Sequence, residues 1–191
     1  MPPISAVCFD AFGTLIRYHG QPVNPYRHLL QAAEDWQALR SSLLTRNATV
    51  DTFAKEMELA HLLPLIHREL AQELAGLSLF PEVAALLPQL RAAGKRLAVC
   101  SNLAFAYGAS VKQLLPKLDA HILSYEVGAA KPERAIFQAV CDALACAPEE
   151  ILFIGDSKRC DLEGPLAFGM QAHWLDRKAG QTLVNAVAGW V

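Results

Sequence analysis

The segment near the N-terminus that decides the fold reads Ala6-Val7-Cys8-Phe9-Asp10-Ala11-Phe12-Gly13-Thr14-Leu15. Its first four residues are all apolar, and a short run of this kind predicts a central parallel strand that is buried on both faces. Asp10 ends the run, and a carboxylate at the end of a buried strand is costly unless other groups compensate it. Gly13 then permits a tight turn. In isolation Asp10 could simply cap that turn, so a functional role for it depends on other motifs in the chain.

Four further apolar runs predict strands, at Leu97–Cys100, Ile122–Leu123 with Tyr125 and Val127, Ile151–Ile154, and Ala172–Leu175. Helical patterns lie between them. Pro81–Ala93 begins with a proline and stops before Gly94, and Pro132–Ala145 also begins with a proline. These are typical helix start and stop signals. Strands that alternate with helices predict an α/β fold, here a Rossmann-like three-layer core with a mainly parallel sheet.

The stretch from Tyr18 to Leu79 breaks this alternation, because we find no convincing strand in it. Apolar residues recur at helical spacing in its first half, and Thr52–Leu62 and Pro64–Leu77 have the pattern of further helices. We therefore expect a small helical cap, residues 17–80, inserted into a core formed by residues 1–16 and 81–191. Near the C-terminus an apolar stripe predicts one more helix docked on the core, with Leu183, Val184, Val187, Trp190 and Val191.

The composition indicates a globular protein with a sizeable core, because 53% of the 191 residues are hydrophobic and 19% are charged. A net charge of −2 without a basic patch argues against binding to nucleic acid or to a membrane surface. The N-terminus lacks the basic region of a signal peptide, so we expect a cytoplasmic protein. Five cysteines without a Cys-x-x-Cys pair favour reduced thiols over disulfides or zinc.

Four polar residues stand where predicted strands end or predicted helices begin, namely Asp10, Ser101, Lys131 and Asp156. Three of them directly follow a predicted strand, and Lys131 precedes a predicted helix. In open α/β sheets, ligands bind outside the carboxyl ends of the strands. The fold therefore predicts that these side chains converge on one crevice, although each alone could be a turn or surface residue.

The most specific of these segments reads Gly155-Asp156-Ser157-Lys158-Arg159-Cys160-Asp161-Leu162-Glu163-Gly164-Pro165. Two aspartates that are five positions apart and flanked by glycines can lie at the rim of a strand and at the start of a helix. Mg²⁺ prefers oxygen ligands, keeps several waters and needs only one or two carboxylates from the protein. The segment therefore predicts a magnesium site.

Together these segments resemble the motifs of the haloacid dehalogenase superfamily, in the same order, over about residues 4–16 and 81–176. The family pattern is Asp-x-Asp-Gly-Thr, then Ser or Thr, then Lys, then Gly-Asp-x-x-x-x-Asp. Here it is matched by Asp10 to Thr14, Ser101, Lys131, and Asp156 with Asp161. The family places a helical cap between its first two motifs, where Tyr18–Leu79 falls. The resemblance implies a hydrolase that acts on a small-molecule substrate, with phosphorylated compounds the first choice.

The resemblance also implies catalytic roles. Asp10 would attack an electrophilic phosphorus or carbon and form a covalent intermediate, which splits one difficult step into two. Ser101 and Lys131 would bind the phosphoryl oxygens and offset charge during transfer. Thr14, in the first motif, completes the catalytic set.

The metal and substrate contacts follow from the same resemblance. Mg²⁺ would lie between Asp10, the backbone carbonyl of Phe12, and Asp156, and Asp161 would support the metal or the motif lysine. Phe12 and Asn102 would contact the substrate.

The chain departs from the family's phosphatases at Phe12. In those enzymes the residue two after the nucleophile is an aspartate that protonates the leaving group and later activates water, and Phe12 can do neither. Because general acid–base catalysis contributes about 10²–10⁴-fold, we expect ordinary alkyl phosphates to be poor substrates. Substrates with good leaving groups, such as acyl or aryl phosphates, would be affected least.

Two alternatives stay open. Phe12 and the Ser101-Asn102 pair resemble the 2-haloacid dehalogenases, whose aspartate attacks carbon without a metal and whose cap supplies a halide-binding arginine, for which Arg40 and Arg46 are candidates. The carboxylates of the fourth motif fit that enzyme less well. The chain could also be an inactive member that binds a phosphorylated ligand or a protein. We rank the Mg²⁺-dependent phosphatase first, the dehalogenase second and the inactive binder third.

Overall fold

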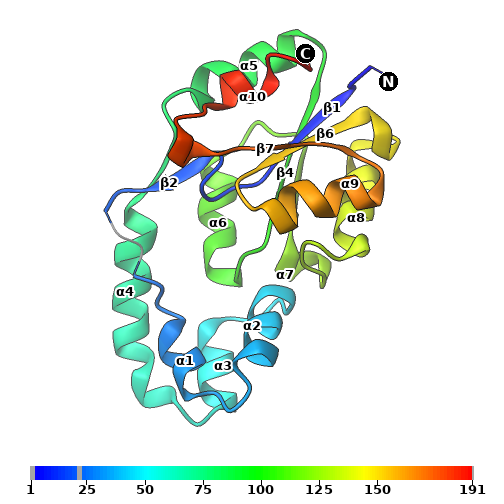
Figure 1. Cartoon of the computed structure of the whole chain (residues 1–191). Helices are drawn as coiled ribbons and strands as arrows, with labels where there is room; N and C mark the ends of the chain where they lie inside the picture. The colour runs from blue at the N-terminus through cyan, green and yellow to red at the C-terminus, as the bar shows by residue number, and fades with distance from the viewer. Residues whose placement is uncertain (1–2, 21–22, 191) are drawn as a thin grey trace.

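A computed structural model of the chain describes residues 3–20 and 23–190, and its centre is a five-stranded parallel sheet (Figure 1). The strands, in the order β5-β4-β1-β6-β7, are β1 (Ala6–Phe9), β4 (Arg96–Ser101), β5 (Ala120–Leu123), β6 (Ile151–Gly155) and β7 (Gln171–Trp174). Phe9 of β1 pairs with Val99 on one side and with Ile154 on the other. The first strand is therefore central and fully buried, as its unbroken apolar sequence predicts.

Helices cover both faces of this sheet, which confirms the three-layer core. One face, which includes Val7 and Phe9, packs in a cluster with α5 (Val83–Ala92), α6 (Phe105–Leu114) and α10 (Leu183–Val187). The opposite face, which includes Cys8, packs with α8 (Arg134–Leu144). Short helices complete the core, namely α7 (Ser124–Val127), η2 (Pro148–Glu150), the π-helix η3 (Lys158–Glu163), α9 (Gly164–Phe168) and η4 (Arg177–Ala179).

A helical unit is inserted between β1 and β4. Its elements are α1 (Arg27–Ala32), α2 (Trp36–Thr45), α3 (Val50–Glu56), η1 (Ala60–Leu62) and α4 (Leu63–Ala75). Figure 1 shows these helices set apart from the sheet, with α2 next to α7 of the core. Asp35 caps the start of α2, and Thr49 caps the start of α3, through their side-chain oxygens. Local sequence signals thus set where α2 and α3 begin.

The expectation that the insertion lacks strands is wrong at both of its ends. The strand β2 (Ile16–Tyr18) pairs in antiparallel fashion with β3 (Leu77–Leu79), and α4 ends at Ala75 instead of continuing to Leu77. Each strand has three residues, too few for a recognisable alternation, and its partner lies at the opposite end of the insertion. This ribbon is where the chain enters and leaves the helical unit, close to the predicted boundaries at residues 17 and 80.

Two other segments differ from the sequence prediction. Tyr125 and Val127, which were expected to extend a strand, lie in α7, and Gly128 ends that helix with a positive φ of 78°. The helix predicted over Thr52–Leu62 is divided into α3 and η1 by a turn in which Glu58 has a φ of 59°. A short apolar pattern does not show whether a segment extends a strand or begins a helix, which explains the first difference. It also does not show whether one helix or two form, which explains the second.

The predicted C-terminal helix does dock on the core, as α10. Leu183 and Val187 are buried, and α10 contacts α5, whereas Val184 of the predicted stripe is exposed. Val191 lies outside the described residues. Among the helices of residues 3–20 and 23–190, none has the length and hydropathy that would let it cross a bilayer.

Candidate active site

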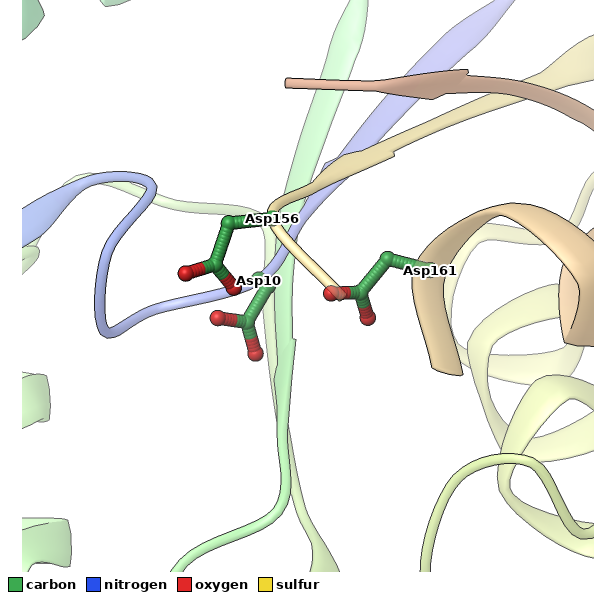
Figure 2. Close-up of side chains that lie close together, drawn as sticks. All are labelled: Asp10, Asp156 and Asp161. Carbon is green, nitrogen blue, oxygen red and sulfur yellow. The ribbon is translucent and has the colours of Figure 1, made fainter. Parts of the chain in front are cut away.

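The strand ends bring three of the predicted residues to one edge of the sheet. Asp10 follows β1, Ser101 is the last residue of β4, and Asp156 follows β6. Since β1 lies between β4 and β6, these residues are neighbours at the carboxyl ends of the strands. Figure 2 shows the carboxylates of Asp10 and Asp156 close together, with Asp161 approaching from η3. The predicted convergence is therefore present in the structure.

Lys131 lies at the centre of this group and is buried. Its Nζ donates to Asp10 Oδ1 at 2.7 Å and to Asp161 Oδ1 at 2.6 Å. The ammonium group also lies 5.1 Å from the centroid of the Phe153 ring. Buried charges are tolerated only when they are paired and hydrogen-bonded in good geometry. Lys131 therefore joins the aspartate of the first motif to the second aspartate of the fourth.

Burial has the largest influence on the ionisation of these groups. It raises the pKa of Asp10 to about 6, an effect that Lys131 offsets and Asp161 reinforces. Burial alone would lower the pKa of Lys131, but the two carboxylates outweigh it and raise that pKa above its usual range. The ammonium group of Lys131, 2.7 Å from Asp10 Oδ1, favours the ionised form of Asp10, which is the form that a nucleophile needs.

Asp156 differs from the other two aspartates, because no side chain in the described part of the sequence pairs with its carboxylate. The side chain is exposed, yet partial desolvation raises its pKa, and the charge of Asp161 raises it further. A Cβ atom on Gly13 would lie 2.2 Å from Asp156 Oδ2, so any other residue at position 13 would clash with this carboxylate. The three aspartates offer oxygens within 4.8 Å of one another. An unpaired carboxylate beside a second one is a donor set that fits Mg²⁺.

Asp161 is occupied by contacts within the protein. Its Oδ1 accepts from Lys131, and its Oδ2 accepts from the backbone N–H of Ser157 at 2.9 Å. It approaches the chain so closely that a Cβ atom on Gly155 would lie 2.4 Å from its carboxylate. These contacts favour a role in holding Lys131 over direct binding of the metal.

The remaining predicted residues reach the site less directly. Asn102 uses its whole amide on the backbone of Lys131, because Nδ2 donates to the carbonyl at 2.8 Å and Oδ1 accepts from the N–H at 2.7 Å. It therefore positions Lys131, and its contact with substrate stays a prediction. Ser101 is buried at the strand end. Thr14 is fully buried, and its hydroxyl has no hydrogen-bond partner among the residues that the structure describes.

Sequence reasoning missed Arg177, which holds the turn that follows Asp10. Its Nε donates to the Gly13 carbonyl at 2.9 Å, its Nη2 donates to the Thr14 carbonyl at 2.5 Å, and its Nη1 pairs with Glu82 at 2.8 Å. These partners lie between 95 and 164 positions away in the sequence. No local pattern around Arg177 therefore indicates this role.

A cavity of about 420 Å³ adjoins the site between the insertion and the core. Phe12 and Asn102 line it from the core, and Arg40 of α2 and Glu73 of α4 line it from the insertion. Arg46, the other arginine considered for halide binding, instead pairs with a glutamate of α3. A hollow of about 570 Å³ lies along α5, but none of the predicted site residues lines it. The smaller cavity is therefore where the organic part of a substrate would fit.

A parallel α/β core with an aspartate, a lysine and further aspartates at its carboxyl edge defines a hydrolase of the haloacid dehalogenase type. Residues 4–169 match the family model of haloacid dehalogenase-like hydrolases, and the chain belongs to that family. Its family and its relatives identify the protein as an enzyme of the hydrolase class.

Similar proteins include both expected reaction types. The chain is 32% identical over 134 residues to phosphoserine phosphatase of Thermus thermophilus, a match that covers 65% of this chain and 53%, about half, of that relative. It is 29% identical over 199 residues to (S)-2-haloacid dehalogenase 1 of a Pseudomonas species, which covers 93% and 86% of the two chains. A HAD family enzyme of Bacteroides thetaiotaomicron, solved with magnesium and inorganic phosphate, has the same fold, with a TM-score of 0.70, 22% identity, and 91% and 94% coverage.

Proposed function

We propose that this protein is a Mg²⁺-dependent phosphohydrolase that acts on a small-molecule phosphate through Asp10. The observation that supports this most is Asp156, an exposed carboxylate beside Asp10 that no side chain within residues 3–20 and 23–190 neutralises. Without a metal ion, as in the 2-haloacid dehalogenases, this pair of aspartates would repel the carboxylate of a 2-haloacid. A metal ion would neutralise both aspartates and attract a phosphate.

The chain's own residues would then act in two steps. An oxygen of Asp10 attacks phosphorus as the bond to the leaving group breaks, which produces an aspartyl phosphate and the free alcohol or acid. Water next attacks the phosphorus, which releases phosphate and restores the Asp10 carboxylate. Lys131 and Ser101 hold phosphoryl oxygens in both steps. Because Phe12 has no acidic proton, the leaving group must take its proton from solvent.

Asp10, Asp156 and the backbone carbonyl of Phe12 would hold Mg²⁺, which when bound would stabilise the negative charge of the transferring group. Arg177 supports this arrangement, because it binds the carbonyls of Gly13 and Thr14, the two residues that follow Phe12 in the chain. We propose that residues 17–80 act as the cap that selects the substrate, since Arg40 and Glu73 line the adjoining cavity from that unit.

Phe12 is the observation that favours a second function, 2-haloacid dehalogenase. In that reaction Asp10 would attack the carbon that bears the halogen, halide would leave, and water would hydrolyse the resulting ester. Arg40 lines the same cavity as Phe12 and would receive the halide. The dehalogenase relative also matches most of the chain.

A parallel screen separates the two functions. We expect phosphate release from aryl and acyl phosphates in Mg²⁺, loss of that activity in excess EDTA, and no halide release from 2-haloacids. Inorganic phosphate and halide are measured in the same protein preparation. Halide release that persists in EDTA, without phosphate release, would assign the dehalogenase reaction instead.

Replacement of Phe12 by Asp tests the missing acid. We expect kcat/KM for alkyl phosphates to rise by up to about 10²-fold. This is the lower limit of the range that general acid–base catalysis contributes. Phe12→Asn is the matched control. The asparagine side chain has nearly the same size and shape as that of aspartate, but it cannot act as an acid. An equal response of both variants would show that access to the pocket, and not the acid, limits the wild-type enzyme.

A further inference from the structure

The adjoining cavity contains a carboxylate that the proposed chemistry does not use. Glu73, near the end of α4, is 7% exposed and faces the same space as Phe12. Its Oε2 accepts from the backbone N–H of Asn24 at 3.0 Å, and its Oε1 accepts from the Tyr107 hydroxyl at 3.3 Å. Each contact uses one lone pair, so the carboxylate retains acceptor positions for a ligand.

No cationic group in the described part of the chain compensates this charge. Lys131 is already bound between Asp10 and Asp161. Arg40 lines the same cavity but is exposed, and it makes no ion pair among the described residues. A buried carboxylate that has neutral donors but no counter-ion strongly favours the arrival of a cation.

The walls beside Glu73 are aromatic. Phe12 stacks on Tyr18 with ring centroids 5.4 Å apart, and it meets Tyr107 edge-to-face at 5.7 Å. Tyr26 continues this wall, 6.2 Å from Tyr107, and its buried hydroxyl has no hydrogen-bond partner among the described residues. Aromatic faces around a carboxylate are the surroundings that attract an organic ammonium group.

We propose that this cavity binds a cationic amino group of the substrate through Glu73 and the surrounding rings. The inference rests on the proposed function and refines it, since it defines the substrate class as phosphates whose organic part carries an ammonium group. The phosphoryl group would lie at Asp10, and Phe12, which belongs to both the first motif and the cavity wall, would separate it from the ammonium end. Arg40, at the exposed side, would face any further anionic part of the substrate.

Two aryl phosphates that differ in one group provide the test, 4-(aminomethyl)phenyl phosphate and 4-(hydroxymethyl)phenyl phosphate. Their leaving groups are similar, but only the first is a cation at neutral pH. We expect kcat/KM of the wild type to favour the ammonium ester by about 10- to 100-fold, the range expected for a hydrogen bond between charged groups. In Glu73→Gln the side-chain oxygen can still accept from the Asn24 N–H, and the amide NH2 can donate to the Tyr107 hydroxyl. This variant should remove most of the preference, so that it hydrolyses the two esters with similar kcat/KM.

Glu69→Gln is the matched control, because Glu69 lies one turn earlier on α4 and is already paired with Arg27. It should leave the preference intact. Equal kcat/KM for the two esters in the wild type, or an equal loss for both in Glu73→Gln, would overturn the proposal and leave Glu73 as a contact that ties the insertion to the core.

Binding separates this inference from the proposed function. If neither ester is hydrolysed, the phosphate screen alone decides the phosphohydrolase assignment, and calorimetry with benzylammonium and with benzyl alcohol tests the cavity. Tighter binding of benzylammonium that is lost in Glu73→Gln supports the ammonium site. Equal binding of the two probes, or binding of neither, contradicts it.

Discussion

Replacement of Asp10 by Asn is expected to abolish turnover of every substrate, with a fall in kcat on the order of 10⁴-fold or more. The amide has almost the same size as the carboxylate but cannot form the covalent intermediate. Lys131 retains Asp161 at 2.6 Å in this variant, so the fold should persist. Steady-state kinetics on the best substrate of the screen measures the loss, and thermal unfolding verifies the fold.

Asp142→Asn is the control for this experiment, because Asp142 is exposed on α8. It should retain wild-type kcat. If Asp10→Asn kept kcat within about tenfold of the wild type, the nucleophile would have to be another group, and both proposed reactions would lose their first step.

Replacement of Lys131 by Met is expected to lower the free energy of unfolding substantially. It leaves Asp10 and Asp161 buried beside each other without their shared cation, and removal of one partner of a buried ion pair typically costs about 3–5 kcal/mol. For a chain of this size the cost corresponds to a fall of roughly 6–20 °C in the thermal midpoint. Urea unfolding of the metal-free protein measures the change in the free energy of unfolding.

The chain offers a matched control in Lys112, whose Nζ lies 2.6 Å from Glu126 in an exposed pair. Lys112→Met should cost at most about 1 kcal/mol, because water solvates both charges when the pair is broken. The two lysines make contacts of nearly equal length, but Lys131 is buried with two carboxylate partners, whereas Lys112 is exposed with one. Equal losses for the two variants would contradict the inferred role of Lys131 as the shared counter-ion.

The sequence predicted the parts of this protein that depend on local pattern. The apolar run before Asp10 predicted a central strand, and the one before Asp156 predicted a second. Because parallel strands end at the same edge of a sheet, their convergence followed without a structure. The alternation of strands and helices likewise predicted the three-layer core, and the resemblance of the motifs placed the chain in its family.

Other features depend on contacts between residues that are distant in the sequence. The ribbon of β2 and β3 escaped prediction, because three residues per strand leave no periodic signal. Arg177 has no motif around it, and its role appears only when the fold brings it to the carbonyls of the turn after Asp10. The electrostatic environment of Glu73 also appears only in the folded structure, because it depends on which charged groups lie nearby.

By itself, then, the sequence determined the sheet, the helical insertion, the family, and the placing of Asp10, Ser101 and Asp156 at one edge, because hydrophobic periodicity and strand direction are local properties. Only the tertiary structure decided that Lys131 is shared by Asp10 and Asp161, that Asp156 is left unpaired within the described residues, and that Glu73 faces an aromatic cavity. Those results depend on burial and on the distances between charges. The fold sets both, and no local segment of the sequence specifies them.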